Sequence, residues 1–137
     1  MPGLIALVAA LAVATALGGA LRLRAGRMRA PGASRSAPLT AADLAAPLGE
    51  QATLVQFSTE FCAYCGPARE LLGEVAAAGN GVALIEIDAA ERMDLARRLN
   101  VFATPTVFVL GPAGDIRSRI GGVPRKADVL RAVGTAR

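Results

Sequence analysis

The fold is decided by the stretch TLVQFSTEFCAYCGPARELL, residues 53–72. Its first five residues form an apolar run typical of a buried strand, and residues 62–78 favour a helix. At the junction lie Cys62 and Cys65, the only two cysteines of the chain. A C-x-x-C pair at a strand-to-helix junction, in a chain that alternates strands and helices, indicates a dithiol–disulfide redox centre.

The composition excludes most other uses of this pair. A structural zinc site needs four Cys or His ligands, whereas the chain has two Cys and no His; we expect no metal and no cofactor. A c-type haem requires His directly after the second cysteine, where Gly66 stands. A disulfide that serves stability alone usually encloses a longer loop. Two inert buried thiols remain an alternative.

Several function classes are also excluded. Without His there is no Cys-His or Ser-His nucleophile, which removes the common hydrolase mechanisms. No nucleotide-phosphate motif of the G-x-x-x-x-G-K-[ST] or G-x-G-x-x-G type is present. Residues 1–42 hold five Arg and no acid, whereas residues 43–137 hold ten basic and eleven acidic side chains. The larger part is near neutral, so we expect no nucleic-acid partner.

The N-terminal segment LIALVAALAVATALGGAL, residues 4–21, carries no charge. As a helix it would span about 27 Å, close to the roughly 30 Å of a bilayer's hydrocarbon core. We therefore predict a transmembrane anchor over residues 1–21. The alternatives are a buried core helix and a signal peptide cleaved near Ala14-Thr15-Ala16, although the basic region that precedes the apolar run of a signal peptide is missing.

Residues 22–38, rich in Arg, Gly, Ala, Ser and Pro, are expected to form a basic flexible linker. Its arginines are Arg22, Arg24, Arg27, Arg29 and Arg35. Because loops rich in Lys and Arg stay cytoplasmic, we expect a single-pass membrane protein with its domain on the cytoplasmic side. These arginines would also attract anionic head groups. The alternative is an extracytoplasmic domain.

Residues 39–137 are predicted to be one α/β domain. The strands are expected at 53–57, 82–87, 106–110 and 116–120, and the helices at 40–48, 62–78, 91–100 and 124–133. Thr40 is the expected N-cap of the first helix, with Asp43 in a capping-box position. This order predicts a central mixed β-sheet with helices on both faces.

Residues 40–133 resemble the thioredoxin family. The motifs that carry the resemblance are Val55-Gln56-Phe57, the aromatic Phe61 before Cys62 and Cys65, Thr104-Pro105-Thr106 before a β-hairpin, and Gly121-Gly122. In that family the proline is cis and faces the dithiol, so the resemblance implies a thioredoxin-like fold with a cis peptide bond before Pro105. The strand with its C-x-x-C, the proline element and the glycine pair, three separated elements in the right order, are more specific than C-x-x-C alone.

The resemblance also implies an activity, that of a thiol–disulfide oxidoreductase. Cys62 would be the nucleophile, with a thiol pKa lowered at the N-terminus of the helix, and Cys65 would resolve the mixed disulfide. Thr104 would offer its backbone to the substrate next to Pro105, and Phe61, Tyr64 and Phe102 would supply apolar contacts. The expected partners are disulfide-containing protein substrates and an upstream reductase or low-molecular-weight thiol.

The chain departs from the family at several positions. Gln56 stands where an acid is usual and Leu84 where its lysine partner is usual, so proton transfer for Cys65 must come from water or from a group such as Glu60. Ala63-Tyr64 replaces Gly-Pro between the cysteines, so the family's reduction potential does not carry over.

Three alternatives remain open. Residues 65–69, CGPAR, imitate the family's C-G-P-C-[KR] with its second cysteine lost, a frame that makes Cys65 a lone nucleophile. The domain could instead be extracytoplasmic and of the cytochrome c maturation type, although the 42 residues between Cys62 and Pro105 leave little room for the insertion common there. Finally, it could be a binding module whose cysteines do no catalysis.

Overall fold

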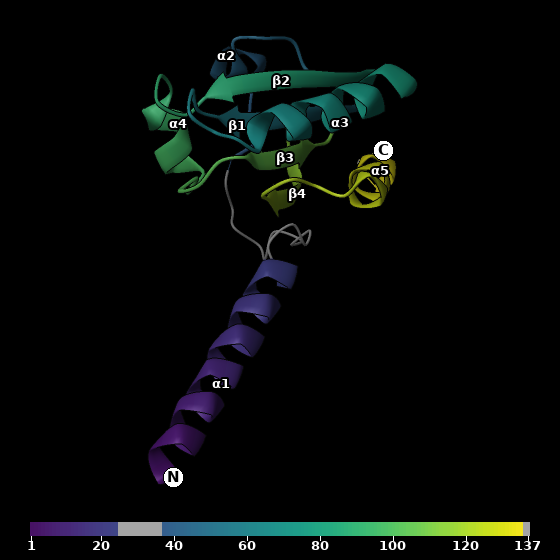
Figure 1. The fold of residues 1–137 in the computed structure, drawn as a ribbon. Coiled ribbons are helices and arrows are strands. Elements are labelled where there is room, and N and C mark those ends of the chain that lie inside the picture. Colours follow the sequence, from purple (N-terminus) through teal and green to yellow (C-terminus); the bar gives the residue numbers. More distant parts are fainter. Residues whose placement is uncertain (25–36, 136–137) are drawn as a thin grey trace.

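The computed structural model describes residues 1–24 and 37–135. The elements, in chain order, are α1 (Pro2–Arg24), α2 (Ala41–Leu44), β1 (Ala52–Ser58), α3 (Cys65–Ala78), β2 (Val82–Asp88), α4 (Met93–Arg98), β3 (Thr106–Leu110), β4 (Ile116–Gly121) and α5 (Lys126–Thr135) (Figure 1). The predicted order of strands and helices is confirmed over these residues.

The four strands form one mixed sheet in the order β2-β1-β3-β4. β1 pairs in parallel with β2 and antiparallel with β3, which in turn pairs antiparallel with β4. Every residue of β1 is buried, because the strand has a neighbour on each side and helices over both faces. This explains why its sequence is an apolar run rather than an alternation.

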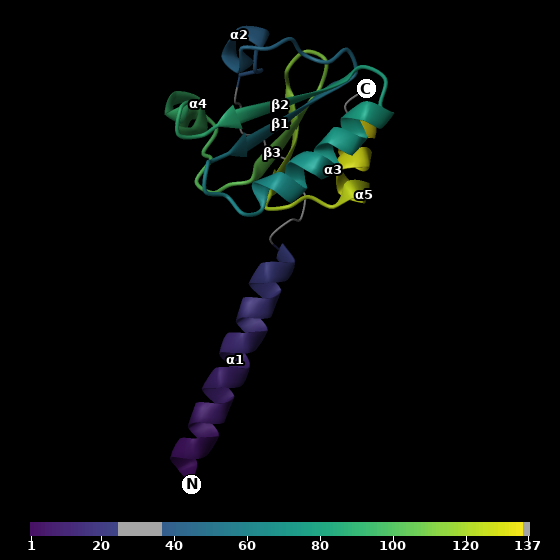
Figure 2. The same cartoon turned by 45° about the horizontal axis from the view of Figure 1, so that its top comes forward.

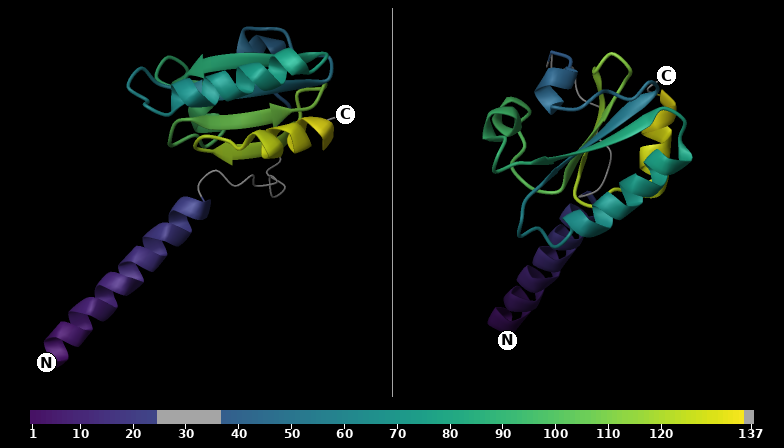
Figure 3. Two further views of the ribbon diagram at one scale, coloured as in Figure 1. Left: turned by 45° about the vertical axis from the view of Figure 1, so that its right-hand side comes forward. Right: turned by 90° about the horizontal axis from the view of Figure 1, so that it is seen from above.

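Helices α3 and α5 cover one face of the sheet, and α2 and α4 lie on the other (Figure 3). On the first face, Leu72 of α3 and Val129 of α5 pack on Leu54 of β1 and Val107 of β3. The two helices lie side by side (Figure 2), and the Lys126 ammonium pairs with the Glu74 carboxylate at 2.9 Å. The C-x-x-C pair lies at the start of α3 on this face.

The second face has a separate apolar core. Leu44 of α2 and Leu95 of α4 pack there with Phe57 and Phe108, whose rings meet edge to face. The predicted capping box at Thr40 is confirmed, since its hydroxyl accepts the Asp43 N–H at 3.1 Å and the carboxylate accepts the Thr40 N–H at 2.8 Å. Helix α4, on this face, borders the candidate functional site.

Three of the predicted helices differ from the structure at their ends. The first helix stops at Leu44 rather than residue 48, because Ala45 adopts a left-handed conformation and Pro47 follows. The helix predicted over 91–100 is Met93–Arg98, because the Asp88 carboxylate accepts the Ala90 and Glu91 N–H groups and holds them in a turn. The helix predicted over 124–133 is Lys126–Thr135, so Pro124 precedes the helix instead of lying in its first turn.

Helix α1 holds a 20-residue apolar span, Pro2–Leu21, with mean hydropathy 2.4 and no buried residue. Its length and composition fit a membrane span or a signal sequence. The helix runs three residues past the predicted end of the span, to Arg24. Most of the predicted linker, residues 25–36, lies outside the described residues.

Candidate functional site

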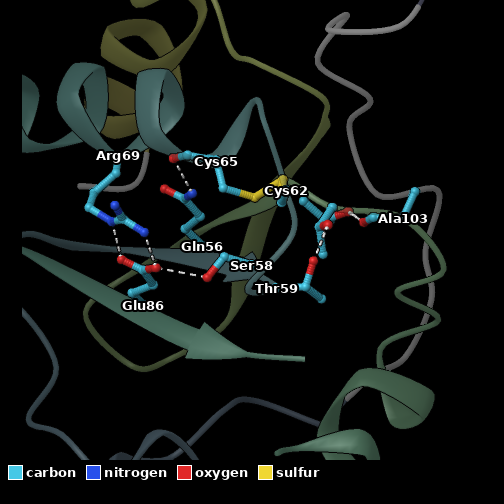
Figure 4. The surroundings of a disulfide bond; sticks show 10 residues. Gln56, Ser58, Thr59, Cys62, Cys65, Arg69, Glu86 and Ala103 are labelled. Carbon is cyan, nitrogen blue, oxygen red and sulfur yellow. Dashed lines mark hydrogen bonds and ion pairs between the residues drawn. A yellow bond between two sulfur atoms is a disulfide. The ribbon is translucent and has the colours of Figure 1, made fainter. Parts of the chain in front are cut away.

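Cys62 and Cys65 are joined by a disulfide, with their Cα atoms 5.5 Å apart (Figure 4). Cys65 is the first residue of α3 and is only 2% exposed, whereas Cys62 lies in the preceding turn and is partly exposed. One sulfur of the pair is therefore packed against the domain, and the other lies nearer to solvent.

The helix begins at Cys65, three residues later than predicted. Pro67 explains the correction, because proline has no N–H and clashes with the carbonyl four residues before it, so it fits only in the first helical turn. A start at residue 62 would place Pro67 beyond that turn. Instead, the Cys62 N–H donates to the Thr59 carbonyl and the Cys65 N–H donates to the Cys62 carbonyl, each at 3.3 Å.

Gln56 lies in the middle of β1 beneath the start of α3 and is fully buried. Its Nε2 donates to the Cys65 carbonyl at 2.9 Å (Figure 4). Its Oε1 is buried without a hydrogen-bond partner among the described residues. A neutral amide thus anchors the backbone of Cys65 where the family usually has an acid, and it cannot exchange a proton near neutral pH.

A polar cluster beside Gln56 joins α3 to the sheet. The Arg69 guanidinium pairs with the Glu86 carboxylate, which also accepts the Ser58 hydroxyl at 2.8 Å (Figure 4). The hydrogen bond from Arg69, together with that from Ser58, holds the pKa of Glu86 below its usual value despite partial burial. Arg69 lies one turn after Cys65, so the pair fixes the beginning of α3 against β1 and β2.

The peptide bond between Thr104 and Pro105 is cis, as predicted. The Thr104 hydroxyl lies 3.3 Å from that of Thr59, whose carbonyl accepts the Cys62 N–H. These contacts tie residues 99–105, which link α4 to β3 and are called the cis-proline segment below, to the turn that carries Cys62. Gly122, with a positive φ of 78°, donates its N–H to the Pro105 carbonyl at 2.9 Å, which gives the predicted Gly121-Gly122 pair a physical role.

Arg119 of β4 supports the same segment from its other end. Its guanidinium donates to the Leu99 carbonyl at 2.7 Å and to the Asn100 carbonyl at 2.6 Å, and lies 5.2 Å from the centre of the Phe108 ring. Burial lowers the pKa of Arg119. The segment is thus held by its flanks, whereas the backbone N–H and carbonyl of Thr104 have no hydrogen-bond partner within residues 1–24 and 37–135.

The aromatic residues divide into two groups. The chain has four Phe and one Tyr, of which Phe57 and Phe108 are in the core. The other three are exposed around the disulfide or on the cis-proline segment: Phe61 at 93%, Tyr64 at 67% and Phe102 at 86%. Large aromatic rings exposed to solvent are typical of surfaces that contact other macromolecules.

Sequence reasoning missed Thr59 and Arg119 as parts of the site. The only signal for Thr59 was its position three residues before Cys62. Arg119 had none, because its contacts cross 19 and 20 residues of sequence and depend on the strand pairing. The structure places Glu60, the suggested source of proton transfer, on the exposed surface.

Comparison with known proteins agrees with this arrangement. The family model for Thioredoxin matches residues 38–135. None of the curated proteins matches the chain.

Three thioredoxin structures show the same fold. Mitochondrial thioredoxin 3 from Saccharomyces cerevisiae in its oxidized form is 21% identical, with a TM-score of 0.55 over 63% of this chain and 79% of its own. Thioredoxin NaTrxh from Nicotiana alata is 24% identical, with a TM-score of 0.57 over 64% of this chain and 75% of its own. A mutant thioredoxin from Halobacterium salinarum is 18% identical, with a TM-score of 0.58 over 64% of this chain and 75% of its own.

Proposed function

We propose that this chain, which belongs to the thioredoxin family, is a membrane-tethered oxidoreductase that reduces protein disulfides. The observation that carries the proposal is the asymmetric disulfide, in which Cys65 is 2% exposed while Cys62 is partly exposed in a turn that is hydrogen-bonded to the cis-proline segment. A pair that serves only packing does not require one cysteine to be partly exposed near a segment whose backbone groups are free.

The proposed reaction is thiol–disulfide exchange. The Cys62 thiolate attacks one sulfur of the substrate disulfide, and the other substrate sulfur leaves and takes a proton from water. Cys65 then gives up its proton to water and attacks Cys62, closing the disulfide and releasing the second substrate thiol. Two electrons and two protons pass to the substrate, and an upstream reductase or low-molecular-weight thiol must restore the dithiol.

The surroundings of each cysteine suit these two roles. The Cys65 backbone is held by Gln56, and its helix is held by the Arg69–Glu86 pair, so its sulfur stays within reach of Cys62. The N-cap residue of α3 is Tyr64, and its side chain makes no capping hydrogen bond. The positive end of the helix therefore lies close to the dithiol and favours a thiolate there. The frame with Cys65 as a lone nucleophile is less well supported, because that sulfur is buried.

The proposed substrate is a polypeptide rather than a small molecule. The backbone groups of Thr104, free within the described part of the chain, allow a substrate segment to add as a short strand. The exposed rings of Phe61, Tyr64 and Phe102 supply apolar surface for such a segment.

The proposed tether is α1, whose apolar span is followed by arginines at positions 22, 24, 27, 29 and 35. The positive-inside rule then favours a cytoplasmic domain. In the Cys65→Ser variant Cys62 is the only thiol, so a membrane-impermeant maleimide should label it only after the cells are permeabilised. Equal labelling of intact cells would place the domain outside, and recovery of the chain in the soluble fraction would refute the tether.

The activity is tested with the full chain in detergent micelles. We expect it to accelerate the reduction of insulin disulfides by dithiothreitol, and Cys62→Ser should reduce the rate to that of dithiothreitol alone. Ala63→Ser is the matched control, since it changes an exposed residue between the cysteines without removing a thiol. Equal rates for wild type and Cys62→Ser would support a non-catalytic binding module instead.

A further inference from the structure

An open pocket of about 430 Å³ lies between α4 and the cis-proline segment. Its walls include Met93, Ala96 and Arg97 of α4 and Val101, Phe102 and Thr104 of the following segment. The volume falls within the range of about 300–1,000 Å³ that is common for ligand sites. None of the described residues fills it.

The pocket is continuous with the proposed substrate-binding edge. Thr59 and Thr104, whose hydroxyls are 3.3 Å apart, both contribute to its wall. The Thr59 carbonyl also accepts the Cys62 N–H, and Thr104 carries the free backbone groups. Because side chains of an extended strand point alternately to its two sides, a substrate segment paired with Thr104 presents some of them to this pocket.

The lining is mostly apolar, and its large side chains are exposed. Met93 is 49% exposed and Phe102 is 86% exposed. Both line the pocket, so an apolar group placed between them covers both side chains. Methionine is flexible and polarizable, which suits a wall that takes more than one apolar side chain. This part of the pocket fits Leu, Met or Phe better than a polar residue.

Arg97 is the charged residue of the lining. Its neighbours are paired, since Arg92 contacts Asp94 and Arg98 contacts Asp43 at 3.0 Å. The Arg97 guanidinium has no hydrogen bond or ion pair within residues 1–24 and 37–135. It therefore offers an unpaired positive charge at the pocket, and a carboxylate is its natural partner.

We propose that this pocket selects substrate polypeptides in which an apolar residue and an acidic residue flank the reactive cysteine. The apolar side chain enters between Met93 and Phe102, and the carboxylate pairs with Arg97. This inference rests on the proposed function, because it assigns the preferred substrate of the same dithiol.

The experiment uses four synthetic peptides, each closed by one disulfide. In the first peptide, Leu and Asp flank the reactive cysteine. In the other three, Ser replaces Leu, Asn replaces Asp, or both replacements are made. The full chain in micelles, recycled by dithiothreitol, reduces each peptide. After subtraction of the rate with dithiothreitol alone, kcat/KM is obtained from the reduced peptide separated by chromatography. We expect replacement of Leu to lower kcat/KM about tenfold and replacement of Asp to lower it about two- to fivefold, as for an exposed ion pair.

Variants connect these preferences to the pocket. Arg97→Gln should abolish the preference for Asp over Asn and leave the Leu preference intact, whereas Arg97→Lys should retain most of both. Arg98→Gln is the matched control, because it removes the same charge from the neighbouring residue, which does not line the pocket. Met93→Ser should weaken only the preference for Leu.

The outcomes separate this inference from the proposed function. If wild type reduces all four peptides at one rate, or if Arg97→Gln and Arg98→Gln lose the Asp preference equally, the pocket assignment is wrong while the activity stands. A kcat/KM that falls as the protein concentration rises would indicate a second copy over the pocket and would also overturn the assignment. If no peptide is reduced, the proposed function itself fails.

Discussion

Cys65 and Cys62 share one covalent bond, yet their surroundings are opposite. Cys65 is buried at the start of α3, with its carbonyl bonded to Gln56 and its helix joined to the sheet by Arg69 and Glu86. Cys62 lies in a turn between exposed aromatic rings, beside a segment that has free backbone groups. The comparison teaches that the fold buries one cysteine and leaves the other partly exposed, the asymmetry that the proposed resolving and attacking thiols require.

The largest expected effect comes from exchanging the cysteines one at a time. Cys65→Ser should accumulate mixed disulfides with substrate proteins, because nothing remains to release Cys62, whereas Cys62→Ser should accumulate none. Both variants should lose at least about a hundredfold in turnover, since exchange needs both thiols. Non-reducing gels and mass spectrometry of the adducts give the measurement. If only the Cys62→Ser variant accumulated adducts, the attacking and resolving roles of the two cysteines would be the reverse of those proposed.

The second prediction concerns Gln56, which holds the backbone of the buried Cys65. Gln56→Glu places a carboxyl in a fully buried site where one side-chain oxygen has no hydrogen-bond partner among the described residues, so burial raises its pKa above that of the unfolded chain. The folded state then favours the protonated form, so stability is lost as pH rises above about 4.3. We expect a loss of at least about 2 kcal/mol at pH 7.

Gln56→Leu is the matched control for that pH dependence. It removes the hydrogen bond to the Cys65 carbonyl and also the unpartnered Oε1, so it should cost about 1 kcal/mol at every pH. Urea unfolding between pH 4 and 8, followed by circular dichroism, compares the two variants. Parallel pH curves would mean that position 56 reaches solvent in the folded protein.

The third prediction concerns Arg119, which supports the segment that carries Thr104. Arg119→Ala should cost about 2 kcal/mol, because two carbonyls lose a charged donor and Phe108 loses its contact with the guanidinium. KM for insulin should rise more than kcat falls, since the segment that carries Thr104 loses its support. Arg117→Ala on the same strand is the control and should have little effect, because its pair with Asp115 is exposed. A change in kcat alone would argue against a positioning role.

The smallest effect is expected for Glu86→Gln. The pKa of Glu86 is lowered, chiefly by Arg69, so its contribution to stability is present above about pH 4.3 and is lost as pH falls through the folded-state pKa. Both side chains are at least a third exposed, which limits the effect at pH 7 to less than about 1 kcal/mol. Thermal unfolding should show the wild-type and variant curves converging in acid. A constant difference at all pH values would assign the effect to packing.

The sequence predicted the strands well because their apolar runs reflect burial, which does not depend on the details of the turns. It also placed the cis bond before Pro105 and the Gln56 substitution beneath the dithiol. The predicted start of α3 at residue 62 was wrong, although the position of Pro67 already favoured a later start. Arg119 and the pocket beside Met93 could not be predicted, since both arise where distant segments meet in the folded chain.

The central claim is that sulfur 62 is reactive and sulfur 65 is shielded, and alkylation tests it most directly. The reduced full chain in micelles is exposed to limiting iodoacetamide, quenched at intervals and digested, and the labelled peptides are counted by mass spectrometry. We predict that Cys62 is modified at least about tenfold faster than Cys65, the thiol that is almost entirely buried. Equal rates, or faster labelling of Cys65, would contradict the account.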